Sequence, residues 1–156
     1  MTNKDKKILN FILDEHPDEV LRYVAKNPVA DCIQKELLDN YPETFNFIAP
    51  SMIITEDVMI KMITSKRKSL LPIIMKKHLS FKEQIMFIRT YPEKVKEYQD
   101  FLNKAEDEND CLCPSAENEY FKIKQQRPEL PEIQYIWHPE YAKKDENIEL
   151  LDIDVI

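Results

Sequence analysis

One pattern recurs along this chain about every 25 residues, and it constrains the fold more than any other feature. Each copy holds an apolar pair, a short polar stretch, a proline followed by an acid, and further apolar residues. Pro17, Pro42 and Pro92 mark three copies, and Arg67 stands in the same register in a fourth. A period of roughly 20 to 50 residues is typical of stacked helical repeats. The sequence therefore predicts an all-α fold of four stacked short helix pairs, in an α-solenoid-like arrangement.

Local signals predict where individual helices begin and end. A proline is tolerated at the first helical position, so Pro17 and Pro42 are expected to open the second helix of their copies. Ser80, followed three residues later by Glu83, forms a capping-box pattern. Asn27 is expected to take the left-handed conformation that closes a helix. The expected helices, of about 8 to 11 residues, are too short to be stable alone, so stacking must stabilise them.

The repeat pattern divides the chain in two. Residues 1–104 are expected to form the helical repeat domain, and residues 105–156 an acidic, proline-containing extension packed on it or tethered to it. Ser115 is expected to cap one more helix, followed by an extended strap over residues 128–141 that is laid on the array. Residues 148–156 alternate acids with apolar side chains, a pattern typical of strands or docking peptides.

Glycine is absent from the chain. This absence excludes the P-loop, the dinucleotide fingerprint and the nucleophile elbow, because each needs glycine for a tight turn or a close approach of the backbone. Cys32, Cys111 and Cys113 are an odd number of cysteines, which fits reduced thiols. The sequence shows no signal-peptide pattern and no membrane-spanning apolar stretch, so we expect a cytoplasmic protein without a membrane partner.

The best candidate for a metal site lies near the C-terminal end. His138 and Glu140 have the H-x-E form of zinc deaminases, but Cys111 and Cys113 precede them and lie too close together for that signature. A structural zinc site would lack a fourth ligand and the usual cysteine spacing. We therefore expect neither a metal nor another cofactor.

A second candidate is the acid-histidine run at the first helix–helix turn. Asp14 and His16 have the residue types of general acid–base catalysis. His16, however, occupies the turn position that Tyr41 and Tyr91 fill in other copies. It is therefore expected to be a structural turn residue, and the sequence predicts no enzymatic activity.

Charge is segregated along the chain. Residues 61–96, here called the basic band, carry 10 basic and 2 acidic side chains, whereas residues 1–60 carry 6 and 11 and residues 97–156 carry 6 and 16. Such a band can attract phosphates or an acidic partner, can be a solvated face, or can receive the chain's own acidic C-terminal part. Its charges gather at two turns, in Lys66, Arg67, Lys68, Lys76 and Lys77.

The repeat unit, an apolar pair followed by a proline-acid dipeptide and apolar residues three and six positions on, resembles a known class of repeats. Short two-helix repeats of about two dozen residues occur in some proteins of viruses and intracellular bacteria. Ankyrin, HEAT and TPR arrays have longer units and are more distant. The resemblance covers about two thirds of the chain. It implies an α-helical interaction scaffold and brings no catalytic residue with it.

The leading interpretation is non-enzymatic protein binding by a phage or other viral inhibitor or adaptor that acts on a host protein, including defence systems. One route is imitation of nucleic-acid charge by the acidic residues Glu106, Asp107, Glu108 and Asp110. A second candidate contact is the strand-like docking segment with Leu150, Leu151 and Ile153, which resembles a clathrin-box peptide. The alternative interpretation is nucleic-acid binding through the basic band.

Overall fold

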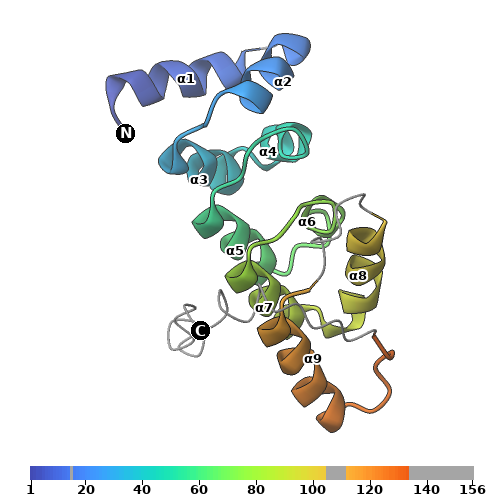
Figure 1. The fold of residues 1–156 in the computed structure, drawn as a ribbon. Helices are drawn as coiled ribbons and strands as arrows, with labels where there is room; N and C mark the ends of the chain where they lie inside the picture. Colours follow the sequence, from blue (N-terminus) through green and yellow to red (C-terminus); the bar gives the residue numbers. More distant parts are fainter. Residues whose placement is uncertain (15, 105–111, 134–156) are drawn as a thin grey trace.

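The computed structural model describes residues 1–14, 16–104 and 112–133, and this part of the chain is helical and contains no strand (Figure 1). The predicted all-α class is therefore confirmed for these residues. The helices in chain order are α1 (Asn3–Leu13), α2 (Pro17–Lys26), α3 (Asp31–Asn40), α4 (Pro42–Ile48), α5 (Glu56–Thr64), α6 (Leu71–Ile74), α7 (Phe81–Thr90), the 3₁₀ turn η1 (Pro92–Lys94), α8 (Val95–Asn103) and α9 (Pro114–Gln126).

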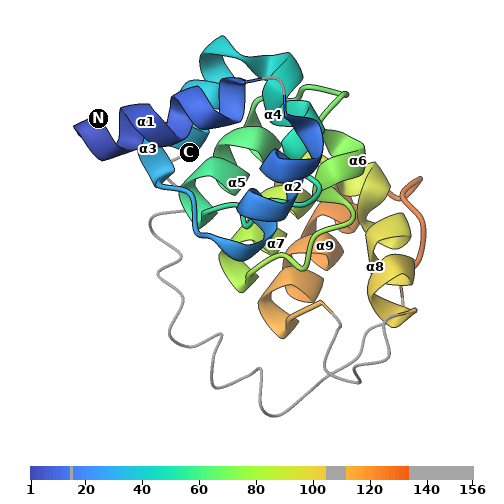
Figure 2. The same cartoon turned by 90° about the horizontal axis from the view of Figure 1, so that it is seen from above.

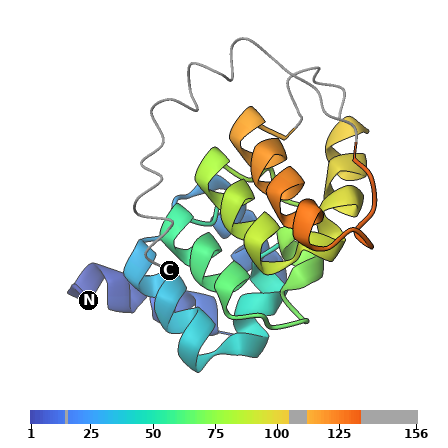
Figure 3. The same cartoon turned by 90° about the horizontal axis from the view of Figure 1, so that it is seen from below.

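Four helices form a row that runs through the molecule. Helix α3 packs on α5, α5 packs on α7, and α7 packs on α9 (Figures 1 and 3). Helices α6 and α8 lie together on one flank of this row in both the side view and the view from above (Figures 1 and 2). Helix α2 contacts α4 near the N-terminal end of the row. Helices α3, α5 and α7 are each followed in the chain by a shorter or more irregular partner.

One apolar core runs through these elements. It begins at Leu9 in α1 and continues to Ile133, without a break between the repeats and α9. Tyr98 in α8 and Tyr120 in α9 are among its fully buried side chains. Helices this short are marginal in water on their own, so burial between neighbours is what stabilises them.

The turns within the helix pairs share one backbone conformation. His16, Tyr41 and Tyr91 have φ between −124° and −133° and ψ between 58° and 73°. Each precedes a proline, which disfavours the helical region for the residue before it. Lys66 occupies this position in the copy without the proline and has a positive φ of 56°. The interpretation of His16 as a turn residue agrees with this shared geometry.

Side-chain hydroxyl groups connect successive copies at the starts of α5 and α7. The Thr55 hydroxyl donates a hydrogen bond to the Asp31 carboxylate over 2.5 Å. One period later, the Ser80 hydroxyl donates to the Glu56 carboxylate over 2.9 Å. Ser80 also forms the predicted capping box with Glu83. The residue at the N-cap position of each of these two helices therefore also bonds to the preceding copy.

Several boundary predictions were wrong in detail. Asn27 has an extended conformation, with φ −117° and ψ 128°, because Pro28 follows it and the chain runs on directly into the next repeat. Helix α9 begins at Pro114 after the cap position Cys113, so Ser115 lies inside the helix rather than capping it. Pro92, which stands where Pro17 and Pro42 open α-helices, opens the 3₁₀ turn η1, and α8 follows it directly.

The segment after α9 is described only to residue 133. Leu130 and Ile133 are buried on the core. The Tyr120 hydroxyl donates a hydrogen bond to the Pro131 carbonyl, which fixes this segment against α9. The remainder of the predicted strap, and the strand-like residues 148–156, lie outside the described residues.

Candidate functional site

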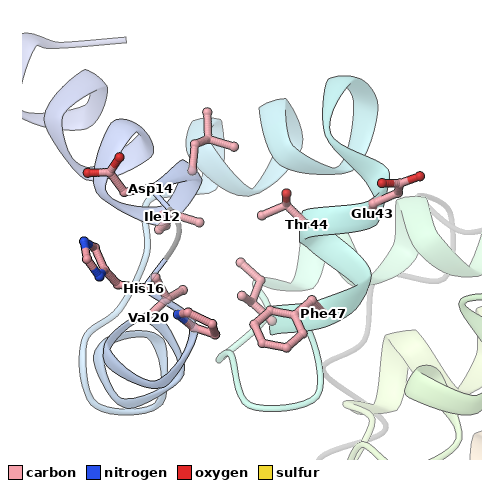
Figure 4. Close-up of a pocket in the computed structure, with 10 residues that line it drawn as sticks. Ile12, Asp14, His16, Val20, Glu43, Thr44 and Phe47 are labelled. Carbon is pink, nitrogen blue, oxygen red and sulfur yellow. The ribbon is translucent and has the colours of Figure 1, made fainter.

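One wide opening among the described residues lies between the first two helix pairs. It is a groove of about 570 Å³, here called the first-seam groove, between the α1–α2 turn and α4 (Figure 4). Its lining residues are Ile12, Leu13, Asp14, His16, Pro17, Val20, Glu43, Thr44, Phe47 and Ile48.

The floor and wall of the first-seam groove are apolar. Ile12, Val20 and Ile48 belong to the core and are at most 3% exposed. Phe47 on α4 lies across the groove from Val20, and half of its side chain, 50%, is exposed (Figure 4). A large aromatic side chain open to solvent beside an apolar floor is a feature of protein interaction sites.

The rim of the groove is acidic. Asp14 and His16 lie on one side of the groove, and Glu43 and Thr44 on the other (Figure 4). Asp14 and Glu43 are exposed and make no ion pair within the described part of the chain. No lysine or arginine lines the groove. The rim therefore carries two carboxylates that no described cation compensates.

The basic band separates into two kinds of residue in the structure. Lys77 donates hydrogen bonds to the carbonyls of Pro50 and Met52, over 3.1 and 3.0 Å, and burial lowers the pKa of its ammonium group. Arg67 donates to the carbonyl of Leu38 over 3.3 Å. These two side chains therefore bind the preceding repeat of their own chain.

Two other cations of the band are also used inside the fold. Lys61 pairs with Asp39 over 2.7 Å, which joins α5 to α3. Arg89 pairs with Glu119 over 2.8 Å, which joins α7 to α9. The band is thus partly a set of bonds between repeats.

The exposed remainder of the predicted site consists of three lysines. Lys66, Lys68 and Lys76 are exposed and make no ion pair with another described residue. They lie at the turns on either side of the short helix α6. Of the five predicted basic-band residues, these three are the ones presented to solvent without a partner in the described part.

The two remaining predicted sites lie outside the described residues. These are the acidic residues Glu106, Asp107, Glu108 and Asp110, and the docking residues Leu150, Leu151 and Ile153. Cys111, and His138 and Glu140 of the H-x-E pattern, also lie outside the described residues. Cys113 is buried and Cys32 is exposed, and neither forms a disulfide bond with another described cysteine.

No group of three or more histidine, cysteine, aspartate or glutamate side chains is placed to hold a metal ion among residues 1–14, 16–104 and 112–133. None of the helices in those ranges combines the length and the apolar character needed to cross a membrane.

Sequence reasoning missed the first-seam groove and the two glutamines that link the repeats. Gln34 and Gln84 are buried, at 0% and 4% exposure. Both stand at the same register, two periods apart, on the buried face of an amphipathic helix. That shared register was the available signal. The groove left no such signal in the sequence, because it forms between Leu13 and Phe47, which are distant in sequence.

Comparison with protein-family models, with curated proteins and with solved structures gave no match for this chain.

Proposed function

We propose that this chain is a non-enzymatic protein-binding module whose first-seam groove receives a segment of a partner protein. The observation that carries this proposal is the apolar floor of the groove beside the half-exposed Phe47. Burying one such aromatic side chain in an interface contributes on the order of 2 kcal/mol or more. The stacked helix pairs would serve as an α-solenoid-like scaffold that holds the groove open.

In this proposal the chain acts as an inhibitor or adaptor, of the kind found in viruses, that occupies a surface of a host protein. The acidic residues at 106–110 would add long-range attraction for a basic target, because charge complementarity accelerates encounter. This role needs no catalytic group. It accords with a site built from apolar side chains and exposed carboxylates.

An affinity pull-down from a host lysate tests the proposal, with nuclease-treated and untreated halves. The bait is compared with the variants Phe47→Glu and Ile53→Glu. Ile53 is the matched control, because it is 59% exposed but does not line the groove. We expect a protein that is recovered from both halves by the wild-type chain and by Ile53→Glu, and lost with Phe47→Glu. Identical recovery by all three baits would contradict the proposal.

A second candidate function is nucleic-acid binding through Lys66, Lys68 and Lys76. It is favoured by the exposure of these three side chains at neighbouring turns. Recovery of a partner only without nuclease would support it, and a steep loss of affinity on adding salt would be expected.

A further inference from the structure

We propose that the first-seam groove recognises an arginine flanked by apolar side chains on the partner segment. This inference rests on the proposed function and names the chemistry of the partner. It follows from three observations: a groove-lining residue whose carbonyl has no described donor, the arginine that bonds to the equivalent carbonyl one repeat later, and the charge of the rim.

The unused carbonyl belongs to Leu13, the last residue of α1. The last carbonyls of a helix have no intrahelical donor, and the residue four positions after Leu13 is Pro17, which has no N–H to offer. No described residue donates another hydrogen bond to the Leu13 carbonyl. Leu13 also lines the groove. The C-terminal end of α1 thus carries an acceptor without a donor, at the negative end of its helix dipole.

The next repeat shows how such a carbonyl is satisfied. Leu38 stands one period after Leu13, and Pro42 again removes the N–H four residues on. There Arg67 from the following copy reaches back and donates to the Leu38 carbonyl over 3.3 Å. At the seam between the second and third helix pairs, an arginine therefore supplies the donor that the proline removed.

The first seam has no such arginine. The position one period before Arg67 is Pro42, whose side chain carries no donor. No last-turn basic residue is present in α1 to compensate its own C-terminus. The Leu38 carbonyl at the second seam is bonded to Arg67, whereas Leu13 at the first seam lines an open groove. A partner arginine would make the bond that this chain cannot make for itself.

The rim favours the same occupant. Asp14 and Glu43 line opposite sides of the groove and have no ion-pair partner in the described part of the chain. A guanidinium group has five N–H donors, enough for the Leu13 carbonyl and a rim carboxylate together. The apolar floor and Phe47 would hold the side chains on either side of the arginine. An acidic segment, including the chain's own C-terminal residues, is disfavoured there by charge.

The test uses random dodecamer peptides displayed on phage and panned on the full-length protein. An enriched peptide is then synthesised with its arginine changed to lysine or to citrulline, and its affinity is measured by fluorescence anisotropy. We expect enriched sequences with an arginine between apolar residues, and a loss of at least about tenfold in affinity with citrulline, which is neutral. Asp14→Asn and Glu43→Gln should each weaken binding of the arginine peptide more than that of the citrulline peptide.

A pair of variants tests the equivalence of the two seams. Pro42→Arg should place a guanidinium group where it can bond to the Leu13 carbonyl. It should therefore raise the unfolding temperature and lower the affinity for the arginine peptide. Pro42→Ala is the matched control, because it also removes the proline but adds no donor. If the two variants bind the arginine peptide with equal affinity, the Leu13 carbonyl is not the equivalent of the Leu38 carbonyl, and the inference is overturned.

The remaining outcomes separate this inference from the proposed function. Enriched peptides without a basic residue that still depend on Phe47 would overturn the arginine preference and leave the groove as a binding site. No enrichment, or enrichment unchanged by Phe47→Glu, would count against both. Salt-sensitive self-association that is lost with Phe47→Glu would show that the occupant is the basic band of a second copy, which would also overturn the inference.

Discussion

Gln34 and Gln84 occupy the same register two repeats apart, and each joins the start of its own helix to the start of the next row helix. Gln34 donates to the Val29 carbonyl over 2.9 Å and accepts from the Thr55 N–H over 3.1 Å. Gln84 donates to the Leu79 carbonyl over 3.1 Å and accepts from a backbone N–H in the same way over 2.9 Å. Both are buried.

The partner of that last bond is the N–H of Cys113, immediately before α9. The same kind of bond that fastens the third helix pair to the second therefore also fastens α9 to the fourth pair. Helix α9 continues the row in this respect, although its sequence falls outside the 25-residue pattern.

We expect Gln34→Met to lower the free energy of unfolding by about 1 to 3 kcal/mol. Methionine fits the register, because Met59 is buried there one repeat later. It would, however, leave the Thr55 N–H without its acceptor in a part-buried site. Urea denaturation measures the loss. Gln125→Met, on the exposed surface of α9, is the control and should change the midpoint little.

Glu83 should make stability depend on pH. Burial raises the pKa of its carboxyl group from 4.5 to about 7, against the lowering effect of the Ser80 N–H that it accepts, and the nearby Glu56 charge raises it further. The folded state therefore binds this proton more tightly than the unfolded state. The cost of ionising Glu83 sets in as the pH rises from about 4.5 to about 7 and is constant above.

The variant Glu83→Gln keeps an acceptor for Ser80 and removes the charge. We expect it to be more stable than the wild type at about pH 8, by about 1 to 3 kcal/mol, with the difference vanishing near pH 4. Denaturation curves across this pH range measure it. Glu97→Gln, at an exposed position on α8, is the control. Parallel pH profiles for wild type and Glu83→Gln would contradict the prediction.

The parts of the fold that follow from local chemistry could be predicted from sequence. Pro17 and Pro42 open helices as expected, and Ser80 and Glu83 form their capping box. Each of these signals involves residues within one turn of each other. The all-helical class followed for the same reason, because apolar periodicity within each copy is a local property.

The parts that depend on contacts between copies could not be predicted in this way. Lys77 and Lys76 are adjacent in sequence and alike in charge, yet Lys77 bonds to two carbonyls of the preceding repeat and Lys76 is exposed. Sequence gives no measure of which side chain faces the neighbouring repeat. The first-seam groove likewise depends on how far α2 and α4 stand apart, which no local pattern encodes.

Mutations can separate the basic-band residues that bond to the preceding repeat from those that are exposed without a partner in the described part. We expect the triple variant Lys66→Glu, Lys68→Glu and Lys76→Glu to unfold at the wild-type urea concentration, since none of the three has a partner in the described part. Lys77→Met should lose about 1 to 3 kcal/mol, because the Pro50 and Met52 carbonyls lose a charged donor. The triple variant is then suitable for testing nucleic-acid binding, because a loss of binding would not reflect unfolding. Equal stability of Lys77→Met and wild type would contradict the division.

The acidic residues at 106–110 can be neutralised together. We expect the variant Glu106→Gln, Asp107→Asn, Glu108→Gln and Asp110→Asn to slow association with a basic partner, with little change in dissociation, because long-range charge acts mainly on encounter. Surface plasmon resonance against the partner identified by pull-down measures both rates, at low and high salt. An unchanged association rate at low salt would exclude a role in imitating nucleic-acid charge.

Truncation should show where the folded unit ends. A chain that stops after residue 104 loses α9, and with it Ala116 and Tyr120 from the core and the Arg89–Glu119 ion pair. It also exposes the face of α7 on which α9 packs. We expect this chain to unfold at a clearly lower urea concentration than the full chain, or to aggregate. A chain that stops after residue 133 keeps all of these contacts and should match the full chain in circular dichroism and in its urea midpoint. If the shorter chain is as stable as the longer one, the repeat domain ends at residue 104, as the repeat pattern alone predicts, and α9 is only docked on it.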